Sequence, residues 1–207
     1  MSQLNLKNIE RSTADVEWHP LLPFLPENGR ILFLGSFPPQ RKRWAIDFYY
    51  PNFINDHWRI QGAVFYGDKS HFVKGKTFDL EAIVAHCNRH GIGYYDTATA
   101  VRRLKDNASD KFLEVVVPTD IEALVKKMPH LKAIVVTGEK AAETICKRLG
   151  IETVPKVNGF CSINSSIELY RLPSSSRAYP LAFEKKVEAY RAMFERIQEN
   201  NGSIQSV

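Results

Sequence analysis

Four short apolar runs along the chain have the composition of buried β-strands. A strand covered on both faces of a sheet is apolar at almost every position, and its length is typically about four to eight residues. The runs that fit this description lie at about 30–34, 92–98, 131–138 and 166–175. We therefore expect four strands, each followed by a loop.

Amphipathic segments separate these runs and predict helices. Their apolar residues recur every three or four positions, which places them on one face of a helix. The segments lie within 56–65, 77–91, 115–130, 139–150 and 181–199. In the last of them, the residues expected to point inward are Val187, Tyr190, Phe194 and Ile197.

Capping residues mark the ends of two predicted helices. Thr77 or Asp79 is expected to start the helix within 77–91, and Gly91 to end it. Thr119 or Asp120 is expected to start the helix within 115–130. Local sequence alone thus predicts both ends of the first helix and the start of the second.

The alternation of strands and helices predicts an α/β fold. We expect a three-layer α/β/α sandwich with a short, mainly parallel four-stranded central sheet. One domain would span 1–207, with an irregular lead-in at 1–29 and a flexible tail at 200–207. Because the carboxyl ends of parallel strands share one edge, the loops that follow them should meet there.

Composition narrows the class of protein. The chain has 207 residues, of which 44% are hydrophobic, and a formal net charge of +5, which permits nucleic-acid binding without demonstrating it. Three dispersed cysteines argue against a disulfide framework, and the first twelve residues have no apolar core. No apolar run approaches the roughly 18 residues of a membrane helix. We expect a cytoplasmic monomer without a membrane partner.

Two unusual loops follow predicted strands. The first strand runs into "GSFPP" (35–39) and then into a basic and aromatic segment, "QRKRWAIDFYYPNFINDHW" (40–58). The fourth strand runs into "LPSSSRAYP" (172–180). In this order and on these strands, the two loops resemble the signature motifs of the uracil-DNA glycosylase superfamily, over about residues 30–180. The hypoxanthine-DNA glycosylase branch is the most similar, and the mismatch-specific uracil-DNA glycosylases have a similar layout.

The resemblance implies a monofunctional DNA glycosylase of base excision repair. Such an enzyme hydrolyses the N-glycosidic bond of a deaminated base, here hypoxanthine, uracil or xanthine, after extruding the base from the DNA. It implies DNA with a damaged base as the partner and no metal or cofactor. The rival interpretation is a nucleic-acid-binding protein that kept the fold and lost the chemistry, and a small-molecule α/β enzyme with a closed, neutral cleft is a third.

The first motif departs from the superfamily pattern at two positions. Many members carry Asn, Asp or Glu where this chain has Phe37, and Gly where it has Pro39. Phenylalanine can neither orient nor deprotonate a water molecule. The resemblance then assigns the water to Asn55, which lies three residues before a tryptophan. The alternative is that Asn55 caps the helix that follows, since Asn is favoured there.

The base pocket and the DNA contacts are assigned in the same way. The pocket would contain Gly35, Ser36, Phe37, Pro38, Tyr49, Tyr50 and Asp96. The two tyrosines would stack on the extruded base, or else pack in the core. Phosphates would be held by Arg41, Lys42, Arg43, Ser174, Ser175, Ser176 and Arg177, of which Arg177 is also a candidate to fill the gap that the base leaves. The alternatives are a solvated turn and a solubilising charged face.

Other candidates carry weaker signals. Arg102 and Arg103 follow the second strand and would face DNA, and Asn107 or Ser109 would read a base edge. The lysines Lys185 and Lys186 are expected to serve solubility only. His86 and His90 have the spacing of a zinc pair, which we consider a minor alternative without further ligands.

Overall fold

The computed structural model describes residues 16–104 and 112–199, and a five-stranded sheet lies at its centre. The order of its strands is β5-β2-β8-β10-β9. Their bounds are Ile92–Asp96 for β5, Ile31–Gly35 for β2, Ala133–Thr137 for β8, Glu168–Leu172 for β10 and Phe160–Ser162 for β9. The first four are parallel to one another, and every residue of β2, β5 and β8 is buried, as expected of strands with helices on both faces.

The prediction of a four-stranded sheet is corrected by β9. This edge strand pairs antiparallel with β10, so the sheet is mixed and not wholly parallel. It has only three residues, and Phe160 and Ser162 at its ends are exposed. So short a run has too little pattern to distinguish it from a loop.

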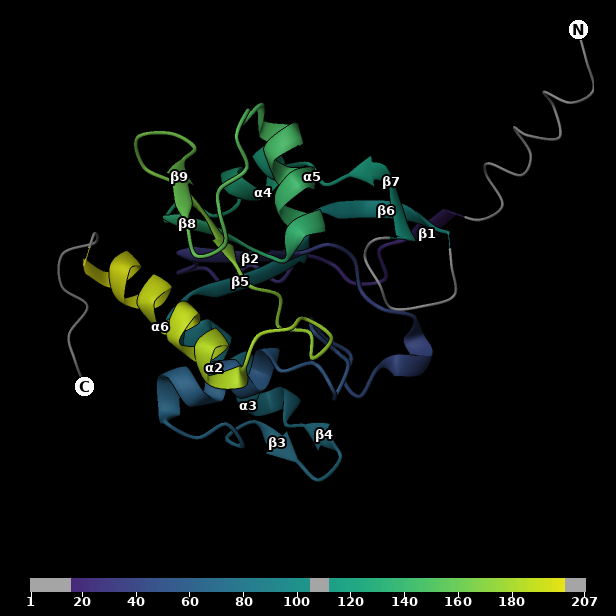
Figure 1. Ribbon diagram of the computed structural model, residues 1–207, viewed down its shortest axis with the longest axis vertical. Helices are drawn as coiled ribbons and strands as arrows, with labels where there is room; N and C mark the ends of the chain where they lie inside the picture. The colour runs from purple at the N-terminus through teal and green to yellow at the C-terminus, as the bar shows by residue number, and fades with distance from the viewer. Residues whose placement is uncertain (1–15, 105–111, 200–207) are drawn as a thin grey trace, which may run out of the picture.

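Helices cover both faces of the central sheet (Figure 1). Two of them, α4 (Ile121–Lys126) and α5 (Glu139–Leu149), lie on one face. The other face is covered by α2 (His57–Tyr66), α3 (Leu80–His90) and α6 (Phe183–Glu199). The three-layer arrangement is therefore the one that the alternating pattern predicts.

The predicted caps are found at the helix ends. The Asp79 side chain accepts a hydrogen bond from the Ala82 amide at the start of α3, and Gly91 ends that helix with a positive φ of 62°. Asp120 does the same for the Ala123 amide at the start of α4. Aspartate, not the neighbouring threonine, is the cap in both helices.

A second sheet flanks the central one. It is antiparallel, in the order β1-β6-β7, with β1 at Val16–Trp18, β6 at Ala98–Arg103 and β7 at Leu113–Pro118. The remaining elements are the hairpin β3 (Val73–Lys74) and β4 (Thr77–Phe78) and the short 3₁₀ helix η1 (Arg41–Arg43). Residues 16–18 of the expected irregular lead-in are thus a strand, because β6 supplies their hydrogen-bonding partners.

Stacked aromatic rings join the helices to the central sheet. The Phe33 ring on β2 stacks on Tyr94 of β5, with centroids 5.5 Å apart, and on Tyr190 of α6, at 6.2 Å. Trp58 of α2 is fully buried and lies 5.3 Å from Tyr94. Both α2 and α6 are therefore packed against the middle of β2 and β5.

Within the described residues, the helices are all too short or too polar to cross a membrane.

Candidate active site

The "GSFPP" turn is held by backbone-directed hydrogen bonds. The Gly35 carbonyl accepts from the Thr97 amide at 2.8 Å. The Pro38 carbonyl accepts from an Arg103 guanidinium nitrogen at 3.1 Å, and the Pro39 carbonyl from the Trp44 indole at 2.6 Å. The turn is therefore fixed on both sides before any ligand arrives.

Arg103 belongs to this support and not to a DNA-facing surface. Its side chain is 7% exposed, and its guanidinium makes two 3.0 Å bonds to the two carboxylate oxygens of Glu17. Arg102 is paired with Glu114 at 2.6 Å. The prediction that this arginine pair faces DNA is thus wrong for Arg103, because β1 brings a carboxylate to it.

Phe37, which was expected in the base pocket, packs inward. It is 7% exposed and lies in a small cluster with Ala98, Val101 and Leu113 of the second sheet. The turn itself therefore presents no ionisable side chain, and its one polar side chain is that of Ser36.

Asp96 occupies the carboxyl end of β5, directly opposite Gly35 of β2 in the parallel register. A Cβ atom added to Gly35 would collide with Asp96 Oδ1, so this oxygen lies over the glycine backbone. The other oxygen, Oδ2, is 2.8 Å from His19 Nε2. The carboxylate thus has one oxygen held by a histidine and one directed at the glycine.

His19 is the principal site residue that sequence reasoning missed. It follows β1 directly, 77 residues before its partner Asp96, and its side chain is 1% exposed. No motif or periodicity around it distinguishes it from other polar residues of the lead-in. Only the pairing of β1 with β6 brings it to the edge of the central sheet.

Tyr50 borders the same space from the other side. Its hydroxyl lies 2.8 Å from Thr137 Oγ1 at the end of β8, and 3.8 Å from the position of an added Gly35 Cβ. Its ring stacks on His57, with centroids 3.7 Å apart and an interplanar angle of 8°. Its backbone φ of 49° is unusual for a non-glycine residue and marks local strain.

His57 supports Tyr50 as a neutral ring. It is fully buried, and its Nε2 lies 2.9 Å from the Tyr94 hydroxyl. Burial holds the pKa of His57 well below its usual value, with a smaller contribution from His86. The ring under Tyr50 therefore adds stacking area without adding charge.

Tyr49 lies in the core. Of the two roles considered for it, stacking on an extruded base and packing in the core, it has the second. It is 4% exposed, its hydroxyl donates to the Leu22 carbonyl at 2.8 Å, and its ring stacks on Tyr94 at 5.8 Å. Burial, and to a lesser extent Asp96, raises the pKa of the Tyr49 phenol. Of the two tyrosines, Tyr50 is the one that lies at the strand ends.

Asn55 lies just before α2. Its side-chain Oδ1 accepts a hydrogen bond from the His57 amide at 2.9 Å, and its carbonyl accepts from Arg59 at 3.2 Å. Asn55 is therefore not the N-cap residue, although its oxygen satisfies the first amide of α2. The role assigned to Asn55 from the sequence, orienting the attacking water, would use its amide nitrogen. That role stays a prediction.

The Pro-Ser loop after β10 is docked on the start of α2 and on α6 (Figure 1). The Asp56 amide donates to the Ser175 carbonyl at 3.1 Å. From α6, Lys186 Nζ donates to the Ser176 carbonyl at 2.7 Å. The loop thus lies beside Tyr50 and Asn55, as expected if the strand ends form one site.

Lys186 corrects the expectation of a solubilising lysine. It is 2% exposed, and burial lowers its pKa. Its ammonium group is directed at the Pro-Ser loop, and its charge is offset by Asp56, which raises the same pKa. Lys186 has charged neighbours in the sequence, at Glu184, Lys185 and Glu188. The sequence pattern therefore does not reveal that this lysine lies on the buried face of the helix.

Arg177 is ion-paired in the free protein. Its Nε lies 2.8 Å from Asp56 Oδ1, and its side chain is 51% exposed while that of Asp56 is 10% exposed. The pair anchors the loop to α2 and places a half-exposed guanidinium at its outer side. This position is compatible with a phosphate contact and with a wedge.

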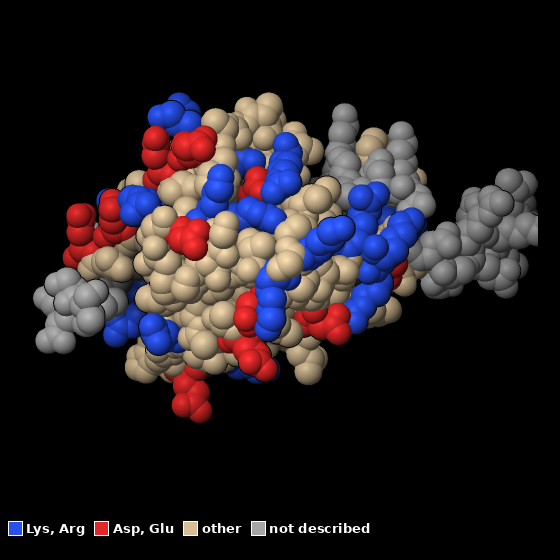
Figure 2. Space-filling model, turned by 90° about the horizontal axis from the view of Figure 1, so that it is seen from below, with Lys and Arg blue, Asp and Glu red and all other residues tan. Residues whose placement is uncertain are grey.

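The basic cluster 41–43 forms the exposed helix η1. Arg41 pairs with Asp47 at 2.7 Å and lies over the Trp44 ring at 4.3 Å, and all three residues of η1 are exposed. Seen from below, Lys and Arg side chains are spread across this face, with acidic side chains among them (Figure 2). The segment 41–43 is thus an exposed basic one, as a phosphate-binding surface requires.

The histidine pair on α3 is built into the packing. His86 is buried, with Nδ1 at 3.1 Å from the Tyr66 hydroxyl and Nε2 at 3.4 Å from Gln61 Oε1. Burial lowers its pKa to about 3. Across the part of the chain that the structure describes, His, Cys, Asp and Glu form no group of three that could hold a metal ion. Asn107 and Ser109 lie outside the described residues.

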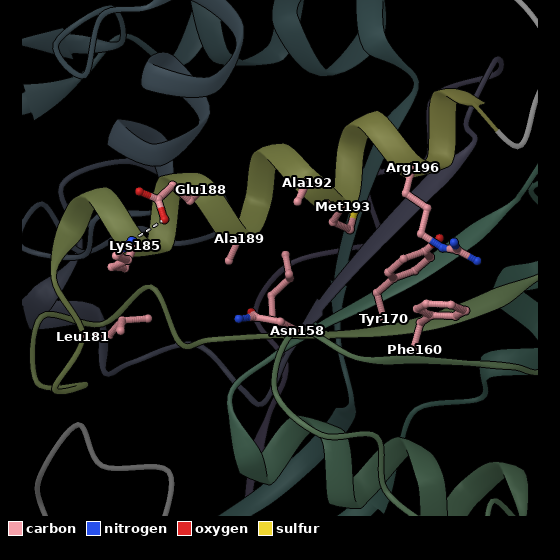
Figure 3. Close-up of a pocket in the computed structure, with 11 residues that line it drawn as sticks. Asn158, Phe160, Tyr170, Leu181, Lys185, Glu188, Ala189, Ala192, Met193 and Arg196 are labelled. Atoms are coloured by element: carbon pink, nitrogen blue, oxygen red, sulfur yellow. Dashed lines mark hydrogen bonds and ion pairs between the residues drawn. The ribbon is translucent and has the colours of Figure 1, made fainter.

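A cavity of about 430 Å³ lies away from these residues, between α6 and the strands β9 and β10 (Figure 3). Apolar side chains such as Met193 and Phe160 line it, and a 2.7 Å ion pair between Lys185 and Glu188 lies on its α6 side. None of the predicted site residues lines this cavity. The candidate site is thus an open edge of the sheet and not the cavity.

Comparison with solved structures relates the chain to a candidate uracil DNA glycosylase from Methanosarcina acetivorans, determined by NMR in solution. The two chains are 24% identical and superpose with a TM-score of 0.62 over 88% of this chain and 99% of the other. No protein-family model and no curated protein sequence matches the chain. The two proteins share a fold.

Proposed function

We propose that the protein is a monofunctional DNA glycosylase that hydrolyses the N-glycosidic bond of a deaminated base in DNA. The observation that carries this proposal is the arrangement around Gly35. Its missing side chain leaves room for the Asp96 carboxylate, and the Tyr50 hydroxyl lies 3.8 Å from the position that a Cβ would take there, at the carboxyl ends of parallel strands. Ligands of open α/β sheets bind at this edge.

Two further features support the proposal. The fold is that of a protein described as a candidate uracil DNA glycosylase. The Pro-Ser loop, the second motif of the superfamily, is docked beside the first through Asp56. In the proposed mechanism the target base leaves the stack and enters the space next to Tyr50, at a cost of a few kcal/mol that new contacts offset.

Each group then has a defined task. The Tyr50 ring, stiffened by His57, lies against the extruded base, and Asn55 orients the attacking water through its amide. The half-buried Ser174 and Ser176 hold the phosphates that flank the target, whereas Ser175, expected to share this task, is 2% exposed and supports the loop from inside. The transition state resembles an oxocarbenium ion, so the site must stabilise positive charge on the sugar and negative charge on the departing base.

The decisive experiment is base release from synthetic DNA. Purified protein is incubated with oligonucleotides that contain hypoxanthine, uracil or xanthine, and abasic sites are counted after alkaline cleavage. We expect release of at least one of these bases without added metal. Binding to the same oligonucleotides with no release of any base would support the rival proposal, a catalytically inactive DNA-binding protein. Absence of both binding and release would contradict the two together.

A first prediction concerns η1. Replacing Arg41, Lys42 and Arg43 by alanine removes charges that we expect to bind phosphates. Each bound phosphate contributes about −0.9 to the slope of log affinity against log salt on duplex DNA, so the slope should become shallower by about 0.9 for every phosphate that the variant fails to bind. Fluorescence anisotropy at several salt concentrations measures this slope.

The matched control removes an equal charge at the opposite end of the sheet. Lys126, Lys127 and Lys132 are exposed and lie at or just after the end of α4, before the amino end of β8. Their triple alanine variant should leave the slope unchanged. Equal slopes for wild type and the η1 variant would remove η1 from the DNA interface.

A second prediction concerns Arg177. We expect Arg177→Ala to reduce turnover of paired duplex substrates more than of single-stranded ones, since a wedge matters only where an extruded base leaves a gap in the stack. Arg148→Ala, which breaks a 2.8 Å ion pair between α5 and Glu122 of α4, is the matched control. Equal losses on both substrates would instead make Arg177 a phosphate-binding residue.

A further inference from the structure

We propose that Asp96, held in place by His19, is the carboxylate that accepts the proton of the attacking water. The proposal rests on the glycosylase function proposed above and adds a proton acceptor to it. An amide such as that of Asn55 can orient water but cannot take up its proton at neutral pH. Phe37 packs inward, and Ser36, the polar side chain of the same turn, cannot take up that proton at neutral pH either.

The structure describes two buried aspartates near the strand ends, and their surroundings differ. Asp56 is paired with the permanent charge of Arg177 at 2.8 Å. Asp96, by contrast, has the imidazole of His19 as its ion-pair partner among the described residues. The Arg177 guanidinium thus occupies Asp56 Oδ1, whereas Asp96 Oδ1 lies at the strand ends over Gly35. Asp96 is therefore the better candidate for a base.

The two oxygens of Asp96 have separate environments. Oδ2 lies 2.8 Å from His19 Nε2, whereas Oδ1 lies over the Gly35 backbone, where a Cβ would collide with it. The space over Gly35 is also where the Tyr50 hydroxyl lies. One oxygen is thus used to fix the carboxylate, and the other is presented to the place where a substrate would bind.

The His19 ring is held so that Nε2 points at Asp96. Its Nδ1 lies 3.1 Å from the Leu21 amide and 2.9 Å from the Leu21 carbonyl, so it can accept from the first when neutral and donate to the second when charged. Nε2–H therefore donates to Asp96 in either state.

Phe37 and Tyr95 pack on the His19 ring, with centroids at 5.3 and 4.6 Å. Such packing restricts rotation of the imidazole. Phe37, the apolar residue of the first motif, thus supports the histidine that positions the carboxylate. His19 is a positioning residue, since it acts through Asp96.

The step balances without a cofactor. The C1′–N bond breaks and its electron pair leaves with the base, while the water oxygen forms a bond to C1′. One water proton passes to Asp96 Oδ1. The base anion takes a proton from solvent, and Asp96 returns its proton to solvent after the product leaves.

The test measures single-turnover release on the base that the wild type cleaves. General-base catalysis typically contributes about 10²–10⁴-fold, so Asp96→Asn should slow release by about that factor. Its melting temperature and its affinity for a duplex with a tetrahydrofuran abasic site should change little. Asp68→Asn, at the far end of α2, removes the same charge and should cleave normally.

A double-mutant cycle tests the positioning role. His19→Ala should slow release about tenfold or more in the wild type and less than threefold in the Asp96→Asn background, because residues that act as a unit are non-additive. His19→Gln, whose amide can also donate to Oδ2, should restore part of the rate. If His19→Ala is too unstable, His19→Gln and Asp96→Asn carry the test.

Three outcomes would overturn the proposal. Wild-type cleavage by Asp96→Asn would remove Asp96 from the mechanism while leaving the glycosylase function intact. A full additional loss from His19→Ala in the Asp96→Asn background would make His19 a stability residue only. A wild-type protein that releases no base would overturn the proposed function and this inference together.

Discussion

Asn55→Ala is expected to reduce single-turnover base release about a hundredfold or more, since removal of one well-placed polar group typically costs about 2.7–4 kcal/mol in the transition state. It should also lower stability, because the Asn55 oxygen accepts from the His57 amide, the first of α2, at 2.9 Å. Loss of a side-chain acceptor at the start of a helix costs about 0.5–2 kcal/mol. The two effects must therefore be separated.

Asn55→Ser separates them. A serine hydroxyl can still accept from the His57 amide, so most of the stability that Asn55→Ala removes should return. Serine has no amide, so release should stay slow. Thermal melting and single-turnover rates on the same preparations provide both readings. A serine variant that cleaves at the wild-type rate would limit Asn55 to supporting the start of α2, without a part in catalysis.

Asn52 provides a matched control in the same loop. Its Oδ1 accepts from the Ile54 amide at 3.1 Å, the same local turn that Asn55 makes with His57. Asn52→Ala should lower the melting temperature slightly and leave base release unchanged. If it slows release as much as Asn55→Ala does, the effect belongs to loop geometry and not to the Asn55 amide.

Gly35→Ala is expected to have a comparable effect on activity through a different cause. The new methyl group would collide with Asp96 Oδ1, and Oδ2 of the same carboxylate is held by His19. The carboxylate must then shift and the space beside Tyr50 shrinks. A displacement of about 1 Å can cost about 10²-fold in rate, and overpacking costs about 1–3 kcal/mol in stability.

Gly67→Ala is the control for this variant. Gly67 ends α2 with a φ of 67° and has open space around its Cα, so alanine there adds backbone strain without a collision. The strain should lower stability by about 1–2 kcal/mol, with normal base release. Normal release by Gly35→Ala, measured in the same assay, would mean that neither the space over Gly35 nor the position of Asp96 matters.

The four parallel strands and the helices were largely predictable because they depend on local pattern. The six-residue strands β6 and β7 were not predicted, and the first residues of the segment 115–130, which was expected to hold a helix, belong to β7. The buried runs at β2 and β8 and the amphipathic face of α6 contain enough apolar residues in sequence to specify their type, and Asp79, Asp120 and Gly91 delimit helices by short-range hydrogen bonds. Elements of two or three residues, such as β9 and β3, could not be predicted, since their existence depends on a partner strand.

The residues of the candidate site could likewise be predicted in part from the sequence. Gly35, Asn55 and the Pro-Ser loop were assignable from motifs, because those residues are close together in sequence or follow strands that share an edge. Their environment was not, because hydrogen bonds such as that of Arg177 with Asp56 span 121 residues.

The sequence by itself therefore determined the α/β class, the helix ends and the meeting of the two motif loops. Only the tertiary structure decided that Lys186 is buried, that Phe37 faces inward and that His19 reaches Asp96. The physical reason is that the burial of a charged or aromatic side chain is set by what packs against it. That partner comes from elements distant along the chain, which no local pattern encodes.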